Sequence, residues 1–442
     1  MLSGNILYER DGLMKKAIVI GSGAAGATVT KELQGKFEVT VLEAGRPFRS
    51  FPYSLTPLAN LRKSGLFFDE REIRLLFPAM QIRKTSEKMV LVNGIGTGGT
   101  TTISTGNALR MDLDLRKMGI NLDDEFNEIN NEIRVSTAHQ KHWKKVTRQL
   151  FETCEEMDLN PQPTSKMGNY ENCNHCGRCI FGCPYGVKWD SRQFLQDAVT
   201  RGTKLMTSCK VKKIVIENGK AKGVVKRQRF NSTFFPADVI ILAAGGFGTP
   251  IILQNSGIEC NAGLFVDPVL CVATEWPDAS QDKEVEMPFF IQQEHFMVSP
   301  YFDYLSFFFN KNWRKPARNI LSLMIKLADI NQGSISAKKV DKNLTNEDKK
   351  HLQQGVDLCT EIFKKMDIKK QDLFLGTINA GHPGGMFPLT ENEADTFHHS
   401  ALPENLYIAD ATLIPKSLGM PPIFTIIAIA KRVSKLLKQK SL

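Results

Sequence analysis

Four cysteines lie within eleven residues, and their spacing is a strong chemical signal. Cys173, Cys176, Cys179 and Cys183, the last followed by Pro184, read C-x2-C-x2-C-x3-C-P. Bacterial ferredoxins hold a cubic iron–sulfur cluster on thiolates with this spacing. Zinc fits less well, because structural zinc usually takes two cysteine pairs separated by a longer loop. The run therefore predicts a [4Fe-4S] cluster, with another metal, a disulfide or unligated cysteines as the alternatives.

The fourth ligand of this cluster is open from the sequence. In two-cluster ferredoxins the fourth cysteine of such a run binds the other cluster, and this chain has only one run. Either Cys183 completes the site, or a distant residue such as Cys154 or Cys209 does. Because a cluster passes electrons one at a time, the run also predicts an external electron carrier, such as a ferredoxin-like protein or a quinone.

A glycine loop near the start of the chain predicts a dinucleotide site. The apolar run 17–21 leads into GSGAAG, a helical pattern follows over 24–33, and Glu43 lies about twenty residues later. Gly21 allows the tight turn, Gly23 lets the backbone approach a pyrophosphate, and Gly26 lets the helix pack on the strand. The helix N-terminus would face the phosphates, and Glu43 would accept a hydrogen bond from a ribose hydroxyl. A strand, turn and helix that merely pack together is the alternative.

Several other segments must position these groups. A second glycine-rich segment over 93–110 lets backbone pass close to a flat ring, unless it is a flexible loop. Residues 203–225 predict a hairpin that turns at Asn218 and Gly219, and 237–258 predict a buried strand followed by a helix. The sheet begun at Lys16 is thus completed about two hundred residues later.

The middle of the chain has a different character. Residues 110–159 have helical spacing and many charges, which indicates a helical cover for the sheet. Residues 287–313 are rich in Phe and Tyr, and 314–330 and 343–366 are predicted to be helical. The aromatic residues would either wall an apolar pocket or form the core of their own sheet.

Composition narrows the class of protein. The chain has 442 residues and a net charge of +10, without the aromatic interleaving or reading motif expected for nucleic-acid binding. The basic groups indicate a solvated surface, with an acidic protein partner or an anionic membrane surface as the alternative. The first sixteen residues show no apolar signal region, and no apolar stretch is long enough to span a bilayer. We therefore expect a cytoplasmic protein.

Five separated blocks resemble the glucose–methanol–choline (GMC) family of flavoprotein oxidoreductases, in the family's order. They are GSGAAG with Glu43, GTGGTTTISTGNALR, AAGGFGTPIILQNSGI, GHPGGM, and the closing NLYIADATLIP…GMPPIFTIIAIAKR. The resemblance spans most of the chain, with the middle least similar. It implies non-covalent FAD bound by Gly21, Ser22, Gly23, Ala24, Ala25, Gly26, Glu43, Ala44, Thr97, Gly98, Gly99, Thr100, Thr105, Val211, Ala244, Asp410, Ala411 and Pro422.

The resemblance also implies a catalytic base. The family removes a proton from an alcohol while hydride moves to the flavin, and histidine titrates near neutral pH. His382 lies in AGHPGGM, where the family keeps a histidine over the flavin, whereas His398 and His399 are expected at the surface. Relatives place a second His or Asn before the final proline, but this chain has Pro421, which offers no side-chain hydrogen bond. Thr105 likewise stands where many relatives have Asn.

Together these observations predict an α/β fold with a Rossmann-like FAD-binding domain and an antiparallel-sheet substrate domain. The FAD-binding domain is assigned to 1–110, 200–263 and 376–442, the cysteine-bearing helical cover to 111–199, and the substrate domain to 264–375. The predicted function is oxidation of an apolar alcohol, with electrons leaving through the cluster. The alternatives are a flavin reductase or desaturase acting on C=C or C=O groups, motivated by Pro421, and a non-catalytic electron-transfer subunit.

Overall fold

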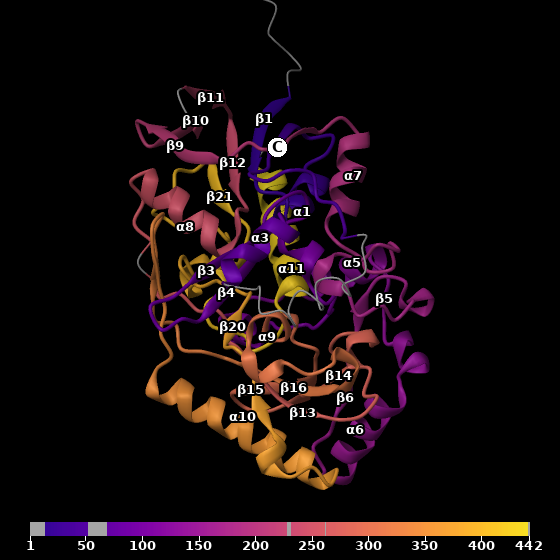
Figure 1. Cartoon of the computed structure of the whole chain (residues 1–442). Coiled ribbons are helices and arrows are strands. Elements are labelled where there is room, and N and C mark those ends of the chain that lie inside the picture. Colours follow the sequence, from indigo (N-terminus) through magenta and orange to yellow (C-terminus); the bar gives the residue numbers. More distant parts are fainter. Residues whose placement is uncertain (1–13, 52–68, 228–230, 261, 441–442) are drawn as a thin grey trace, which may run out of the picture.

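The chain folds around two large β-sheets. The computed structural model describes residues 14–51, 69–227, 231–260 and 262–440. In Figure 1 a parallel sheet with its helices forms the upper part, and a mostly antiparallel sheet lies below it, next to α10 (Asn346–Lys365) and α6 (Lys145–Glu156). Residues 1–13, which make up most of the stretch without a signal region, lie outside the described part.

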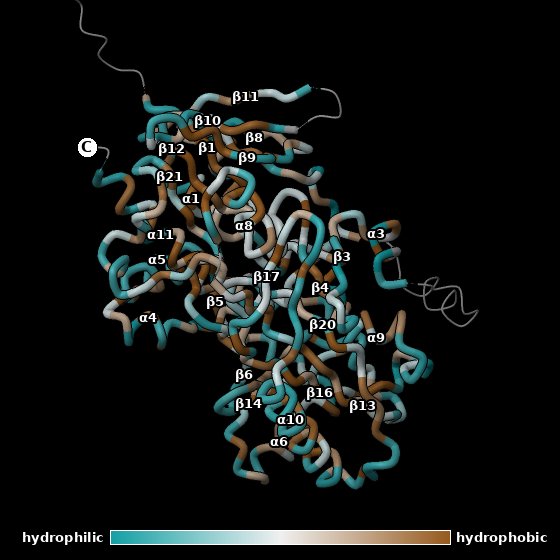
Figure 2. Tube along the Cα trace, turned by 90° about the vertical axis from the view of Figure 1, so that its left-hand side faces the viewer, coloured by the Kyte–Doolittle hydropathy of each residue, from teal (hydrophilic) through white to brown (hydrophobic). Residues whose placement is uncertain are grey.

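The parallel sheet has five strands from distant parts of the chain. Its order is β21 (Leu406–Ile408), β12 (Val239–Leu242), β1 (Lys15–Ile20), β2 (Phe37–Leu42) and β8 (Lys204–Met206), and each neighbouring pair is parallel. All four side chains of β12 are buried, as expected for a strand covered on both faces. Figure 2 shows β1 and β12 among the hydrophobic parts of the trace.

Helices cover the faces of this sheet. Helix α1 (Ala24–Glu32) packs on β1 and β2 and against α11 (Ile423–Lys440) and α7 (Arg192–Thr200). Helix α8 (Gly245–Asn255) packs on β9 (Val211–Glu217), which belongs to a separate three-stranded sheet. The predicted hairpin is present between β9 and β10 (Lys220–Arg227), with Asn218 and Gly219 both at positive φ. Strand β11 (Ser232–Pro236) adds to this hairpin.

The second sheet has nine strands. Its order is β3 (Met80–Lys84), β4 (Val90–Gly94), β20 (Asn379–Ala380), β13 (Val269–Glu275), β16 (Ile320–Leu327), β15 (Phe296–Pro300), β14 (Phe289–Gln292) and β6 (Gln162–Pro163), with β19 (Phe374–Leu375) on β13. Only β4 and β20 pair in parallel. The sheet takes strands from outside 264–375, and the assigned domain boundaries remain a prediction.

One predicted helix is wrong. Within 314–330, residues Ile320–Leu327 form the strand β16, which lies between β13 and β15 with all eight side chains buried. A continuous apolar run fits a buried strand as well as a buried helix, so its period could not decide between them. The second predicted helix, α10, is present and begins with a capping box between Thr345 and Asp348.

Shorter elements complete the fold. Helices in the predicted cover are α4 (Leu113–Lys117), α5 (Asp123–Glu132), α6 and α7, and the remaining short helices are α3 (Ile73–Leu76) and α9 (Tyr304–Phe309). Two small strand pairs are β5 (Val135–Ser136) with β7 (Lys166–Met167), and β17 (Ser334–Ile335) with β18 (Val340–Asp341). Among the described helices, none combines the length and the apolar character needed to cross a membrane.

Candidate active site

A large cavity lies where the parallel strands end. It has a volume of about 1050 Å³, and its wall includes the residues that follow β1, β2, β12 and β21. Ligands of open α/β sheets bind at this carboxyl edge, because loops from several strands meet there. The cavity also receives residues from β3, β4 and the loop after β20, so both sheets contribute to it.

The first glycine loop forms one side of the cavity. Gly21 has φ of +100°, and a Cβ atom there would lie 2.3 Å from the carbonyl oxygen of Ala243, so no other residue fits. A Cβ atom on Gly23 would meet nothing closer than 3.9 Å. Helices α1 and α8 both begin at the cavity, and neither N-cap residue, Gly23 or Ala244, makes a side-chain cap. The positive dipole ends of both helices favour an anion such as a phosphate, although the first N–H of α8, that of Gly245, donates to Asp410.

Glu43 ties three loops together. Its Oε2 accepts hydrogen bonds from N and Oγ of Ser22 at 3.1 and 2.6 Å, and its Oε1 accepts from the N–H groups of Gly45 and Gly96 at 2.8 and 3.2 Å. The side chain is buried yet lies on the cavity wall. Besides any contact with a ribose, this carboxylate therefore holds the glycine loops in register.

Asp410 has a similar role at the other side of the cavity. Its Oδ2 accepts from Gly245 N at 2.8 Å and from Thr249 Oγ1 at 2.6 Å, and its Oδ1 accepts from N and Oγ1 of Thr412. Burial raises the pKa of this carboxyl group above its usual value. The contacts fix the turn that opens α8 next to the segment that follows β21.

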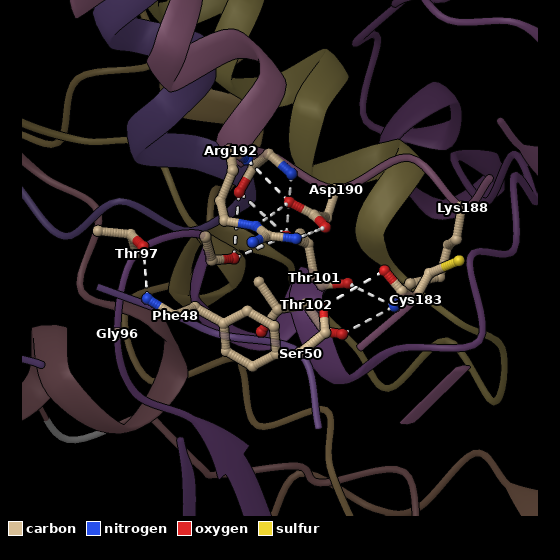
Figure 3. Close-up of polar contacts among 12 residues, drawn as sticks. Phe48, Ser50, Gly96, Thr97, Thr101, Thr102, Cys183, Lys188, Asp190 and Arg192 are labelled. Atoms are coloured by element: carbon tan, nitrogen blue, oxygen red, sulfur yellow. Dashed lines mark hydrogen bonds and ion pairs between the residues drawn. The ribbon is translucent and has the colours of Figure 1, made fainter. Parts of the chain in front are cut away.

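Most residues expected at the cofactor line this cavity. They are Gly21, Ser22, Gly23, Ala24, Ala25, Glu43, Ala44, Gly99, Thr100, Val211, Ala244, Asp410, Ala411 and Pro422. Four lie away from the wall, namely Gly26, Thr97, Gly98 and Thr105. Thr97 Oγ1 instead accepts from Phe48 N at 2.9 Å (Figure 3), and Thr105 Oγ1 donates to the sulfur of Met287.

His382 lies on the wall of the same cavity, in the loop after β20. Its Nδ1 is 3.6 Å from Oδ2 of Asp267, and its side chain is 23% exposed. The pKa of His382 is lowered to about 4, chiefly by burial and also by the Lys326 ammonium, while Asp267 opposes both effects. The imidazole is therefore neutral at pH 7, as a proton acceptor must be. His398 and His399 lie outside this wall.

The four cysteines of the run line one small second cavity, together with Tyr170, Tyr185 and Lys188. Cys179 is buried and the other three are partly exposed. All nine cysteines are free thiols, and Cys154 and Cys209 lie outside this second cavity. Across the described residues no group of three or more Cys, His, Asp or Glu side chains is arranged to hold a metal ion. This arrangement supports neither the predicted [4Fe-4S] cluster nor the zinc alternative, and the cluster stays a prediction from the spacing.

Two buried lysines lie beside the cysteines. Lys188, 2% exposed, donates from Nζ to the carbonyl oxygens of Thr101 and Thr102 at 3.1 and 2.9 Å (Figure 3) and to that of Cys179 at 3.0 Å. The fully buried Lys166 donates to the carbonyl oxygen of Glu286 at 2.6 Å. In the described chain their acceptors are backbone carbonyls and the Asn107 side chain, without a carboxylate.

Comparison with known proteins identifies the family. The sequence model described as GMC oxidoreductase matches residues 15–269, more than half of the chain. The chain belongs to the GMC oxidoreductase family. It is accordingly an oxidoreductase that acts on CH–OH donors, and members of this family typically bind FAD.

Relatives of this GMC oxidoreductase are distant. An uncharacterized protein of Methanocaldococcus jannaschii is 26% identical over 94% of this chain and 97% of its own length. A long-chain-alcohol oxidase of Arabidopsis thaliana is 23% identical over 67% of this chain and 51% of its own length. The crystal structure of pyridoxine 4-oxidase from Mesorbium loti has a TM-score of 0.70 at 13% identity, covering 95% of this chain and 98% of that one. This structural likeness supports the fold.

The aromatic segment does not wall the site of this GMC oxidoreductase. Phe302, Phe307, Phe308 and Trp313 pack into a buried cluster within the second sheet. Among the described residues of 264–375, only 336–340 line the large cavity. Of the two readings of this segment, the sheet core is the one present.

The sequence did not reveal several polar wall residues. Gln81, Arg83 and Asn93, on β3 and β4, line the cavity of the GMC oxidoreductase, and Arg83 donates to both neighbours. Asn93 opens the second glycine-rich segment, which could have marked it, whereas nothing in the pattern distinguishes Arg83. Pro421 is buried and lies outside the wall, so the C-terminal block supplies no second imidazole or amide to the cavity.

Proposed function

We propose that this GMC oxidoreductase oxidises an alcohol with FAD as the hydride acceptor and His382 as the base. We further propose that the electrons leave through a [4Fe-4S] cluster held by Cys173, Cys176, Cys179 and Cys183 to an external carrier. The observation that carries the proposal is that His382 and the dinucleotide loop lie on the wall of one cavity.

The residues present fit FAD. The uncapped N-terminus of α1 offers N–H groups to a pyrophosphate, and Val211, Gly99 and Thr100 also line the cavity. When bound, FAD would supply the acceptor for the hydride. The protein's own contribution is to orient the ring between the glycine-rich segment and the loop of His382.

His382 would remove the hydroxyl proton of the alcohol. Nε2 takes the proton while the electron pair leaves the carbon as hydride, so the products are a carbonyl compound and the reduced cofactor. A neutral imidazole can accept this proton, and the low pKa of His382, about 4, keeps it neutral near pH 7. Asp267 lies close enough to stabilise the imidazolium that forms.

The charges around the cysteines support an anionic cluster. Burial raises the pKa of Cys173 to about 11 and that of Cys179 well above its usual value, so these thiols need nearby cations to become thiolates. Iron would supply one such charge. The ammonium groups of Lys166 and Lys188 also favour the thiolate of Cys179, although burial lowers the pKa of both lysines, that of Lys166 to about 7. Burial raises the pKa of Glu286 to about 8, so this group is largely uncharged at neutral pH. The buried Glu284, which also lines the cysteine cavity, has a pKa below its usual value and lies 3.6 Å from Nδ1 of His175. Buried cations without a carboxylate are costly unless an anion is bound.

The position of the cysteine cavity suits electron transfer. Thr101 lies on the wall of the large cavity, and its carbonyl oxygen accepts from Lys188, which also lines the cysteine cavity. On the other side, Pro184 and Tyr185 are exposed next to the partly exposed Cys183. We infer a dehydrogenase that delivers electrons to a ferredoxin-like protein or a quinone, rather than an oxidase that uses oxygen. The cytoplasmic location remains a prediction.

The polar side chains on the wall of the large cavity bear on which alcohol is the substrate. The sequence predicted an apolar alcohol, but Gln81, Arg83 and Asn93 present polar groups to the cavity. A cationic side chain there favours an alcohol with a polar or anionic group. The panel of test compounds therefore needs long-chain, aromatic and carboxylate-bearing alcohols.

Two measurements test the proposal. The protein is purified anaerobically, and its absorption spectrum, iron and acid-labile sulfide are determined. We expect a flavin spectrum with about four irons per chain. A flavin spectrum with no iron would remove the cluster and the argument for a dehydrogenase.

The second measurement addresses the reaction. The oxidised holoenzyme is mixed anaerobically with each alcohol. In a separate experiment, the dithionite-reduced holoenzyme is mixed with each of a panel of enones. Bleaching of the flavin by an alcohol supports the proposal. Reoxidation by enones without bleaching by any alcohol would favour the reductase that Pro421 suggested. A His382→Ala variant that retains full turnover would favour the non-catalytic electron-transfer subunit.

A further inference from the structure

Two buried polar atoms face each other behind the proposed base. Nδ1 of His382 lies 3.6 Å from Oδ2 of Asp267 and makes no hydrogen bond, whereas Oδ2 is also paired with Nζ of Lys326 at 2.8 Å. Buried polar atoms are almost always paired, and catalytic hydrogen bonds are often long in a structure without substrate. The two atoms are therefore placed to form a hydrogen bond when the site closes around its ligands.

Asp267 is held from three directions. Lys326 of β16 places Nζ 2.8 Å from Oδ2, and both side chains are almost completely buried. Ser417 donates from Oγ to Oδ1, and the N–H of Gly419 lies 3.4 Å from the same oxygen. The backbone N–H of Asp267 donates to Asp329. This carboxylate thus has little freedom to turn away from His382.

The charges behind His382 are balanced. Asp329 and Lys342 form a second buried ion pair, with Nζ of Lys342 2.6 Å from Oδ2 of Asp329. Oγ of Ser417 lies within hydrogen-bond distance of both carboxylates and so joins the two pairs. In the described chain the charged groups that act on the imidazole are Asp267, from the segment before β13, and Lys326, from β16. Because the two pairs are neutral overall, a neutral His382 completes the set without leaving a net charge in the interior.

We propose that Asp267 is a positioning residue that keeps the proton of His382 on Nδ1 and leaves Nε2 free toward the cavity. The idea rests on the proposed role of His382 as base. The alcohol proton then goes to Nε2, and Nδ1–H stays directed at Asp267, which stabilises the imidazolium. Lys326 orients the carboxylate and prevents it from taking the proton itself.

The first test reads the tautomer directly. Two-bond proton–nitrogen NMR spectra are recorded on the holoenzyme with ¹⁵N-labelled histidine, and His382→Gln assigns the signal. We expect Nδ1 to be protonated and Nε2 to be bare at pH 7 in the parent protein. In Asp267→Asn this preference should be lost. A proton on Nε2 in the parent protein, or an unchanged tautomer in Asp267→Asn, would overturn the proposal.

The second test compares two variants whose pH profiles of flavin reduction should shift in opposite directions. Flavin reduction by the alcohol that bleaches fastest is followed against pH in Asp267→Asn and Lys326→Met. Loss of Asp267 should lower the plateau rate about 10- to 100-fold and move the acid limb to lower pH. Loss of Lys326 should move the acid limb to higher pH, because its charge no longer opposes protonation of His382. A structural effect alone would move neither limb in this pattern.

Asp329→Asn is the matched control. It removes a carboxylate of similar burial that also binds Ser417 and a lysine but is not paired with His382. We expect lower thermal stability with an unshifted pH profile. If Asp329→Asn shifts the profile as Asp267→Asn does, the specific role of Asp267 is excluded. A third outcome separates the two claims. If the tautomer preference of His382 is lost in Asp267→Asn, but the flavin in His382→Gln is still reduced at the parent rate, then His382 is not the base although Asp267 does fix its tautomer.

Discussion

Nζ of Lys188 lies 3.0 Å from the carbonyl oxygen of Cys179 and 2.7 Å from that of Ser104. One buried ammonium thus joins the cysteine loop to the glycine-rich segment that borders the large cavity. A backbone carbonyl accepts well from an ammonium, but several carbonyls do not neutralise its charge. The arrangement couples the shape of the cysteine site to the shape of the cofactor site.

Replacing Lys188 should therefore impair the cysteine site first. In Lys188→Met the carbonyl oxygens of Thr101, Thr102, Ser104 and Cys179 lose their shared donor, and a positive charge disappears beside the thiols. We expect a large loss of bound iron, a lower unfolding temperature, and a smaller loss of FAD. Iron and sulfide assays and the flavin absorbance of anaerobically purified protein measure these effects.

Lys213→Met is the control for this change, because Lys213 is exposed on β9 and its side chain lies outside both cavities. It should retain iron and FAD. Full iron content in Lys188→Met would show that the lysine has no part in holding the cluster.

The cysteines themselves make a sharper prediction about the fourth ligand. Serine at Cys173, Cys176, Cys179 or Cys183 should remove most of the iron, because each of these residues lines the same cavity. Cys154→Ser should keep it, since Cys154 is buried on α6. The iron content per chain shows whether Cys183 or Cys154 is the fourth ligand. Loss of iron from Cys154→Ser, with iron retained in Cys183→Ser, would assign the fourth ligand to Cys154.

The parts of the site that sequence reasoning found are those with local patterns. The glycine loop, the cysteine run and His382 each lie in a short segment whose spacing has a physical reason. Asp267, Lys326, Lys166 and Lys188 have no such pattern. Most of their contacts join distant parts of the chain, as between Lys326 and Asp267, 59 positions apart, and between Lys188 and Thr101, 87 positions apart, and periodicity does not encode such contacts.

The fold shows the same limit. Apolar runs that end in glycines predict the parallel sheet, and this sheet is present in the structure. Ile320–Leu327 was predicted to be helical and is instead the strand β16. Its partners β13 and β15 lie elsewhere in the chain, and tertiary pairing rather than local spacing selects the strand.

Gly21 and Gly23 should respond differently to a methyl group. In Gly21→Ala the Cβ atom would lie 2.3 Å from Ala243 O, and the residue would keep a φ of +100°. We expect a loss of about 2 kcal/mol or more in stability, with little soluble protein. In Gly23→Ala the nearest atom is 3.9 Å away, so the protein should fold. It should nevertheless bind less FAD, because the methyl group faces the cavity at the uncapped end of α1.

Soluble yield, unfolding temperature and FAD per chain distinguish these outcomes. Equal FAD content in Gly23→Ala and the parent protein would contradict the placement of a phosphate at this loop. A fully stable Gly21→Ala would contradict the tight turn against Ala243.

Acid should destabilise the protein between about pH 6.5 and pH 4. Burial lowers the pKa of both His139 and His382 to about 4 in the folded protein. In this range the unfolded chain binds protons that the folded chain does not, so stability rises with pH and falls as pH is lowered. His139 accepts from Trp143 Nε1 at 3.0 Å, and its other ring nitrogen lies 2.7 Å from the carbonyl oxygen of Thr164. Its contribution is at most about 1.4 kcal/mol per pH unit.

The test compares denaturant unfolding of the holoenzyme at pH 7 and pH 5 in three variants. His139→Gln should be less stable than the parent protein at pH 7 but should lose less stability on acidification, because one proton-binding difference is gone. His382→Gln should also flatten the dependence, with little loss at pH 7, since its Nδ1 makes no hydrogen bond in the folded protein. His142→Gln, at an exposed position next to the same turn, is the control and should keep the parent slope. If all three variants keep the parent slope, the acid sensitivity lies with other groups, and a neutral His382 in the folded protein loses this support.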